Sequence, residues 1–116
     1  MSTGMIYIVI ESLCQHEQSE TVVCWREDEA DANAIAAELT SEADEMFRRR
    51  DAWETADPEP DFPTDEWRAW SARATNAQPE FAAGMHRHLR MRMTLDREEV
   101  SYRVEGIPRD PSRNDA

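Results

Sequence analysis

The sequence predicts an α+β fold in which helices cover one face of an antiparallel sheet. Three observations predict it. Residues 5–10 form an unbroken β-branched and aromatic run, a second apolar run follows at residues 21–25, and residues 29–53 carry apolar side chains at helical spacing. With two later alternating segments, the expected order of elements is β-β-α-α-β-β, which packs naturally as a sheet with its helices on one side.

The first two segments predict a hairpin that contains the central strand. Residues 5–10 have no polar alternation, which is typical of a strand buried on both faces. Residues 12–19 are polar and are expected to form a loop. Residues 21–25 then form the second strand, and the short connection favours antiparallel pairing.

Residues 29–53 give the clearest helix. Its apolar positions follow one face: Ala32, Ile35, Ala36, Leu39, Ala43, Met46, Phe47 and Trp53. Acidic residues 27–29 precede the first turn, where carboxylates meet the positive end of the helix dipole, and Arg48, Arg49 and Arg50 lie near the C-terminal end.

The proline-rich residues 57–63 predict a loop, after which Thr64 can cap a second helix. Asp65 and Glu66 occupy the first turn of that helix, and residues 76–79 are expected to end it.

Residues 79–95 fit two structures. Apolar residues recur at every fourth position from Phe81 to Met93, as in a helix, but they alternate with polar residues over 89–95, as in a strand. We expect a short helix near 79–86 and a strand over 88–95. That strand would turn at 96–99 and pair with a strand over 100–105, so that Arg90 and Arg92 face acidic residues opposite.

The length of 116 residues predicts a single domain. We expect residues 1–108 to form it, with residues 48–99 as an inserted segment that contains prolines and tryptophans and residues 109–116 as a flexible tail. The apolar run at 5–10 is too short for a signal peptide or a membrane span. With two cysteines and no signal, the expected compartment is a reducing cytoplasm.

Charge is the most unusual property of the chain. The net charge is −12, and residues 1–47 hold eleven acidic residues against one arginine. Residues 48–83 have a net charge of −3 and residues 84–116 a net charge of +1. Such a field repels nucleic acid and attracts basic surfaces, so direct nucleic-acid binding is disfavoured.

Two groups of residues are candidates for partner binding. The first is an acidic surface that Glu17 and Glu20 extend and whose main members are Glu27, Asp28, Glu29, Asp31, Glu38, Glu42, Asp44 and Glu45. It is either a solvated surface that keeps the protein soluble or an array of carboxylates that mimics a phosphate backbone. The second is Trp67 and Trp70, which either pack their helix onto the sheet or anchor a partner.

Catalysis and metal binding have weaker support. Cys14, His16, Cys24, His86 and His88 could converge on Zn²⁺ in pairs, but structural zinc sites usually show CxxC or HxxxH spacing and nothing in the sequence forces these segments together. Otherwise Cys24 is a small core residue and the rest are surface residues. Because no nucleophile signature or phosphate loop is present and the chain has three glycines, we expect neither an enzyme nor a cofactor.

Three sequence features resemble a known group of proteins. These are the run at residues 5–9, the run at 22–25 followed by the alanine-rich helix start at 27–34, and the run at 102–108. They are similar to small phage and prophage proteins that open with a "YIV" strand, continue with a second strand and an alanine-rich helix, and end in a "YRVEE"-like strand. The resemblance covers residues 5–47 and 100–108. It implies an uncharacterised phage accessory protein and no catalytic residues.

The leading hypothesis is therefore a non-enzymatic, phage-derived binding module that acts on a basic host protein. That partner could be a nucleic-acid-binding or defence protein, inhibited by acidic mimicry of nucleic acid as an anti-CRISPR would do. One alternative is a zinc-stabilised module or small metal-dependent enzyme. Another is a structural component that self-associates through its tryptophan-rich insertion.

Overall fold

A computed structural model describes residues 4–15, 17–92 and 94–109. Its contacts divide the chain into two compact units, one containing residues 1–40 and 98–116 and the other residues 41–97. We call them the sheet unit and the helical unit. The helical unit includes most of the segment that the sequence presents as an insertion.

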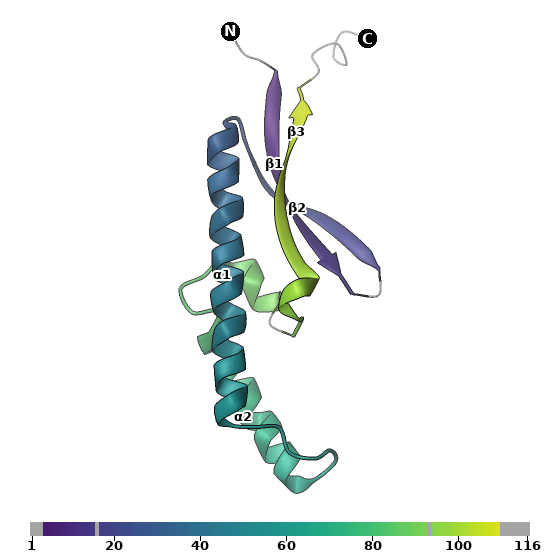
Figure 1. Cartoon of the computed structure of the whole chain (residues 1–116), viewed down its shortest axis with the longest axis vertical. Coiled ribbons are helices and arrows are strands. Elements are labelled where there is room, and N and C mark those ends of the chain that lie inside the picture. Colours follow the sequence, from purple (N-terminus) through teal and green to yellow (C-terminus); the bar gives the residue numbers. More distant parts are fainter. Residues whose placement is uncertain (1–3, 16, 93, 110–116) are drawn as a thin grey trace. The chain divides into compact units, whose positions relative to one another are not determined.

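The sheet unit contains three antiparallel strands, β1 (Met5–Cys14), β2 (Gln18–Arg26) and β3 (Val100–Pro108). Their order is β2-β1-β3, so the first strand is central, as expected, and the first two strands form the predicted hairpin (Figure 1). The hairpin is longer than predicted, because most of the polar segment 12–19 is strand. Polar residues are tolerated there because side chains of a strand alternate between its two faces.

The strand register assigns each side chain to a face of the sheet. Val9 pairs with Cys24 on one side and with Val104 on the other, and these three side chains lie in or against the core. Ile8, by contrast, pairs with Trp25 and Glu105 on the opposite face. An irregularity between Val9 and Ile10 shifts the register of β2 by one residue.

Helix α1 (Glu29–Ala56) starts in the sheet unit, where it covers the face that carries Val9 (Figure 1). Ala32, Ala36 and Leu39 form the buried contact with Val9, in agreement with the predicted helical face. Two alanines in this contact allow the helix backbone to approach the sheet closely. The helix ends three residues later than predicted.

The helical unit consists of the second part of α1, helix α2 (Asp65–Phe81), the 3₁₀ helix η1 (Arg87–Arg92) and the first residue of the 3₁₀ helix η2 (Arg97–Glu99). Thr64 caps α2 as predicted, because its side chain accepts a hydrogen bond from the Trp67 amide at 3.0 Å. The buried apolar residues of this unit are Ala43, Met46, Phe47, Ala77, Phe81, Ala82, Leu89 and Leu95.

The prediction of a strand over 88–95 is wrong, since residues 87–92 form η1 and the described part of the sheet has three strands. A strand would place Leu89 and Met91 on the same side. In the structure Leu89 is fully buried whereas Met91 is 67% exposed, as helical geometry allows. The predicted cross-strand pairing of Arg90 and Arg92 is lost with the strand, and Met93 lies outside the described residues.

The expected boundary near residue 79 is also wrong. Helix α2 continues through Pro79 to Phe81, and a turn containing Gly84 follows in place of a separate helix over 79–86. A proline close to a helix C-terminus removes only one hydrogen bond, so the last turn survives. Gly84 has φ +79°, a backbone angle that residues with a side chain rarely adopt.

Candidate functional site

The acidic residues at the start of α1 belong to the sheet unit, and one of them caps the helix. Asp28 Oδ1 accepts hydrogen bonds from the amides of Ala30 (2.7 Å) and Asp31 (3.4 Å). Asp28 therefore satisfies amides that an uncapped helix leaves without partners. Asp28 is exposed, but its carboxylate already caps the helix.

The other acidic residues of this part of α1 point into solvent. Glu27 pairs with Arg109 of the sheet unit at 3.3 Å, and both side chains are exposed. Within residues 4–15, 17–92 and 94–109, the carboxylates of Glu29 and Asp31 accept no hydrogen bond and form no ion pair. Glu38 is exposed as well.

The acidic residues Glu42, Asp44 and Glu45 of the helical unit differ, because each forms a hydrogen bond or an ion pair with another group of that unit. Glu42 Oε1 accepts a hydrogen bond from the His86 amide at 2.7 Å, and Asp44 pairs with Arg97. Hydrogen bonds from Arg48 and then Arg49 hold the pKa of Glu45 below its usual range. The predicted acidic surface thus divides into an open part at the start of α1 and a neutralised part at residues 42–45.

The two units differ correspondingly in charge. The described residues of the sheet unit contain eleven acidic residues and three arginines, a net charge of −8. The helical unit contains twelve acidic residues and nine arginines, a net charge of −3. The negative field is therefore concentrated on the sheet unit.

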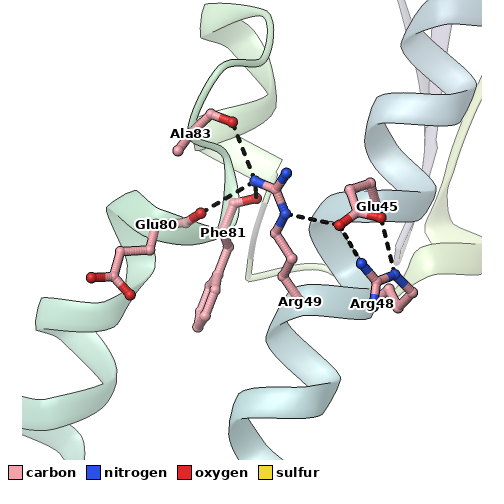
Figure 2. Close-up of polar contacts among 6 residues, drawn as sticks. All are labelled: Glu45, Arg48, Arg49, Glu80, Phe81 and Ala83. Carbon is pink, nitrogen blue, oxygen red and sulfur yellow. Dashed lines mark hydrogen bonds and ion pairs between the residues drawn. The ribbon is translucent and has the colours of Figure 1, made fainter.

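Arg49 shows how the helical unit uses its arginines (Figure 2). Its Nε donates to Glu45, while Nη1 donates to the carbonyl oxygens of Glu80, Phe81 and Ala83 at 3.2–3.4 Å. A cation at the C-terminal end of α2 satisfies free carbonyls and meets the negative end of the helix dipole. Arg49 is thus a structural residue.

Trp67 and Trp70 lie in the helical unit and are partly buried. Trp70 packs against Trp53 of α1 with ring centroids 5.9 Å apart, and its Nε1 donates to the Asp57 carbonyl at 2.6 Å. Trp67 meets Phe62 edge-on at 4.8 Å. The contacts described for both rings are with helix and loop residues of their own unit, which favours a packing role over partner binding.

A cavity of about 260 Å³ lies beside this aromatic cluster. Trp53, Trp70 and Phe81 line it together with Arg50, whose guanidinium lies near the carboxylates of Asp51, Glu54 and Asp96. These three carboxylates offset the positive charge of the guanidinium, so the cavity is unfavourable for an anionic ligand.

Of the five residues considered for zinc, the two cysteines lie apart in the described sheet unit. Cys24 pairs with Val9 on β1, five residues from Cys14, which corresponds to about 17 Å along a strand. Cys14 is exposed, whereas Cys24 packs against the core of the sheet unit. His86 is exposed in the helical unit, while His16 and the side chain of His88 lie outside the described residues. The two cysteines cannot share one tetrahedral ion.

The sequence reasoning missed an apolar surface on the sheet face opposite α1. We call it the outer patch and define it as Ile6, Ile8, Val22, Trp25 and Ile107, which the strand register places on that face. Val22 is 55% and Trp25 53% exposed. The available signal was the consecutive apolar run at 22–25, because an edge strand with apolar residues at both parities has two apolar faces.

An ion pair limits the outer patch along the sheet. Arg103 of β3 pairs with Glu20 of β2, and this contact lowers the pKa of Glu20. Because Ile10 of β1 lies opposite Arg103, the arginine must cross the central strand to reach Glu20. The arginine therefore lies over the part of this face where Ile10 is 6% and Ser12 8% exposed.

A shallow hollow of about 570 Å³ adjoins the outer patch at the end of β2, lined by Cys24, Trp25, Arg26 and Glu27. It brings a half-exposed indole next to the first acidic residue of the candidate surface.

No helix in the described part of the chain combines the length and the apolar character needed to cross a membrane. Comparisons with protein-family models, with curated proteins and with solved structures give no match.

Proposed function

We propose that this protein is a non-catalytic binding module whose partner is a protein with a basic surface. The observation that carries the proposal is the distribution of charge. The acidic residues at 42–45 are occupied by groups of their own unit, whereas Glu29 and Asp31 extend from the start of α1 without such partners among the described residues. A carboxylate left in solvent can pair with a cation supplied by another molecule.

The binding surface comprises Glu27, Glu29, Asp31 and Glu38, on the unit whose described residues carry a net charge of −8. Compared with the surface expected from the sequence, it omits Asp28, which caps α1, and Glu42, Asp44 and Glu45, which have partners in the helical unit. A field of this sign accelerates association with basic proteins and disfavours nucleic acid and anionic membranes. Basic proteins that bind nucleic acid fit it best, because carboxylates can occupy the positions of phosphates.

The biological setting belongs to the same proposal. The resemblance of residues 5–47 and 100–108 to small phage proteins suggests a phage origin and action in the host cytoplasm. A nucleic-acid-binding or defence protein of the host is then the natural partner, and inhibition by mimicry of nucleic acid is the natural mode of action.

A pair of charge reversals tests the proposal with a matched control. Glu29→Lys/Asp31→Lys changes two acidic residues in the first turn of α1, and Asp65→Lys/Glu66→Lys changes two in the first turn of α2. Both double variants alter the net charge by the same amount and act on the same kind of helix end. Tagged wild-type and variant proteins are used to capture bacterial host proteins at low and high salt, with quantitative mass spectrometry.

We expect the wild type and the α2 variant to retain the same basic proteins at low salt. The α1 variant should lose them, since their main contacts are removed, and high salt should weaken capture by all three. Equal capture by the two double variants would refute the proposal, because net charge alone would then explain any binding.

A further inference from the structure

The hollow at the end of β2 lies along the free edge of the sheet. Its lining residues, 24–27, are consecutive in the chain. Since neighbouring side chains of a strand point to opposite faces, a hollow on one face would be lined by alternate residues. β2 has β1 on one side and no described strand on the other, so this backbone edge is accessible to an incoming chain.

The chemistry of the hollow suits an arginine. The Trp25 ring is 53% exposed, and an exposed indole attracts a guanidinium to its face. The Glu27 side chain is 72% exposed, and Oε1 is its only atom with a hydrogen-bond partner among the described residues. Its Oε2 can therefore accept a hydrogen bond from a guanidinium that stacks on the indole.

Two of the chain's own arginines already form hydrogen bonds beside the hollow, one with the backbone of Trp25 and one with the Glu27 carboxylate. Arg26 Nη1 donates to the Trp25 carbonyl at 2.6 Å, and Arg109 Nη2 donates to Glu27 at 3.3 Å. Both contacts are at the surface, where ion pairs and hydrogen bonds of long side chains contribute little to stability. An incoming arginine can thus displace them at small cost.

Charge decides what kind of molecule enters the hollow. A second copy of this chain would bring together two sheet units whose described residues each carry a net charge of −8, which opposes self-association through this edge. A basic segment meets no such repulsion and gains the apolar contact with Val22 and Trp25 of the outer patch.

We propose that the hollow at residues 24–27 is the anchor point for the partner, where an extended segment of the partner lies along β2 and inserts an arginine between Trp25 and Glu27. The inference rests on the proposed function and specifies the partner: a strand-forming segment in which arginines alternate with apolar residues.

A short peptide is the direct probe. We choose Ser-Val-Arg-Val-Arg-Ser, blocked at both ends, and follow the backbone amides of ¹⁵N-labelled protein by NMR during titration. Amide shifts should concentrate at residues 22–27. Trp25→Ser should weaken binding about fivefold, the effect expected from loss of a cation–π contact of ordinary strength. Replacing both arginines of the peptide by lysine should also weaken it.

The matched control is Phe62→Ser, which removes an aromatic side chain that is 69% exposed in the helical unit. It should leave peptide affinity unchanged. Trp25→Phe keeps an aromatic face and should retain most of the binding, which separates loss of the anchor from loss of the fold. Shifts outside residues 22–27, no detectable binding, or equal affinity of wild type and Trp25→Ser would overturn the inference.

The same variants distinguish this inference from the proposal on which it rests. If captured host proteins are lost with Glu29→Lys/Asp31→Lys but kept with Trp25→Ser, the protein binds a basic partner elsewhere and only the anchor is refuted. If neither variant affects capture, both are refuted.

Discussion

The Nη1 atom of Arg49 lies 3.2 Å from the carbonyl oxygen of Phe81, so a side chain of α1 holds the C-terminal end of α2 (Figure 2). The same atom also donates to the carbonyls of Glu80 and Ala83. Arg49→Met should reduce the free energy of unfolding by about 1–2 kcal/mol, because it leaves these carbonyls without their charged donor. Urea unfolding followed by circular dichroism measures the change.

Arg48→Met is the control for that measurement. Arg48 carries the same charge one residue earlier, but among the described residues its side chain bonds with Glu45 alone and is 69% exposed. An exposed surface pair of this kind contributes little to stability, so the control should lie near the wild type. Equal losses for both variants would show that charge, rather than the carbonyl contacts, accounts for the effect of Arg49.

Stability should depend on pH through Asp57 and Arg73. Arg73 donates to both carboxylate oxygens of Asp57, at 2.7 and 2.9 Å, and these hydrogen bonds hold the pKa of Asp57 below its usual range. Because the folded pKa is lowered, the pair stabilises the fold above the ordinary aspartate pKa of about 4, and the contribution is lost as pH falls through the lower, folded value.

The measurement is a urea midpoint recorded from pH 6 to pH 3 for the wild type and for Arg73→Gln. The variant should be less stable at pH 6, and the difference should shrink toward pH 3 as Asp57 takes up a proton. Arg68→Gln, which removes the exposed pair with Asp65, serves as the comparison. A difference that stays constant over this range would exclude the Asp57 pair as its source.

Much of the fold can be predicted from the sequence because local patterns carry it. The run at residues 5–10 and the spacing of Ala32, Ala36 and Leu39 give the central strand and the helix face that covers it. The prediction of a strand over residues 88–95 failed because the alternation at Leu89 and Met91 fits a strand as well as a helix. The burial of Leu89 in the helical unit decides between the two structures.

The candidate site was predicted less completely, because tertiary contacts determine which of its carboxylates are paired and which are open to solvent. Asp44 meets Arg97, 53 residues later, and Glu42 meets the backbone of His86, 44 residues later. The spacing of residues along the chain predicts neither contact. The sequence alone therefore indicates one continuous acidic surface over residues 27–45. The exposure of Trp25 likewise depends on the position of β2 at the sheet edge.

A buried carboxylate in the sheet unit gives a third prediction. Glu11 of β1 is 1% exposed, and the hydroxyl of Tyr102, directly opposite on β3, donates to its Oε2 at 2.9 Å. Tyr102→Phe should reduce the free energy of unfolding by about 1–3 kcal/mol, because a buried acceptor loses a donor where water cannot readily replace it. Thermal and urea unfolding both report the loss.

Tyr7→Phe is the appropriate control, since Tyr7 packs against the same core and its hydroxyl has no hydrogen bond within the described residues. It should change stability by less than about 0.5 kcal/mol. A Tyr102→Phe variant as stable as this control would mean that the hydroxyl contributes nothing to holding Glu11.

The last prediction separates folding from binding at the start of α1. Glu29 and Asp31 lie in the first turn of α1, as Asp65 and Glu66 lie in the first turn of α2, and carboxylates there are favoured by the helix dipole. Reversing either pair to lysine should therefore lower the free energy of unfolding by a similar amount, about 1–2 kcal/mol. If binding were lost only because the protein unfolds, both double variants would lose it together. Because the proposed surface includes one pair alone, we expect equal losses of stability and unequal losses of partner, measured by urea unfolding and salt-dependent capture on the same preparations. A larger loss of stability in the α1 variant would instead assign Glu29 and Asp31 to the fold.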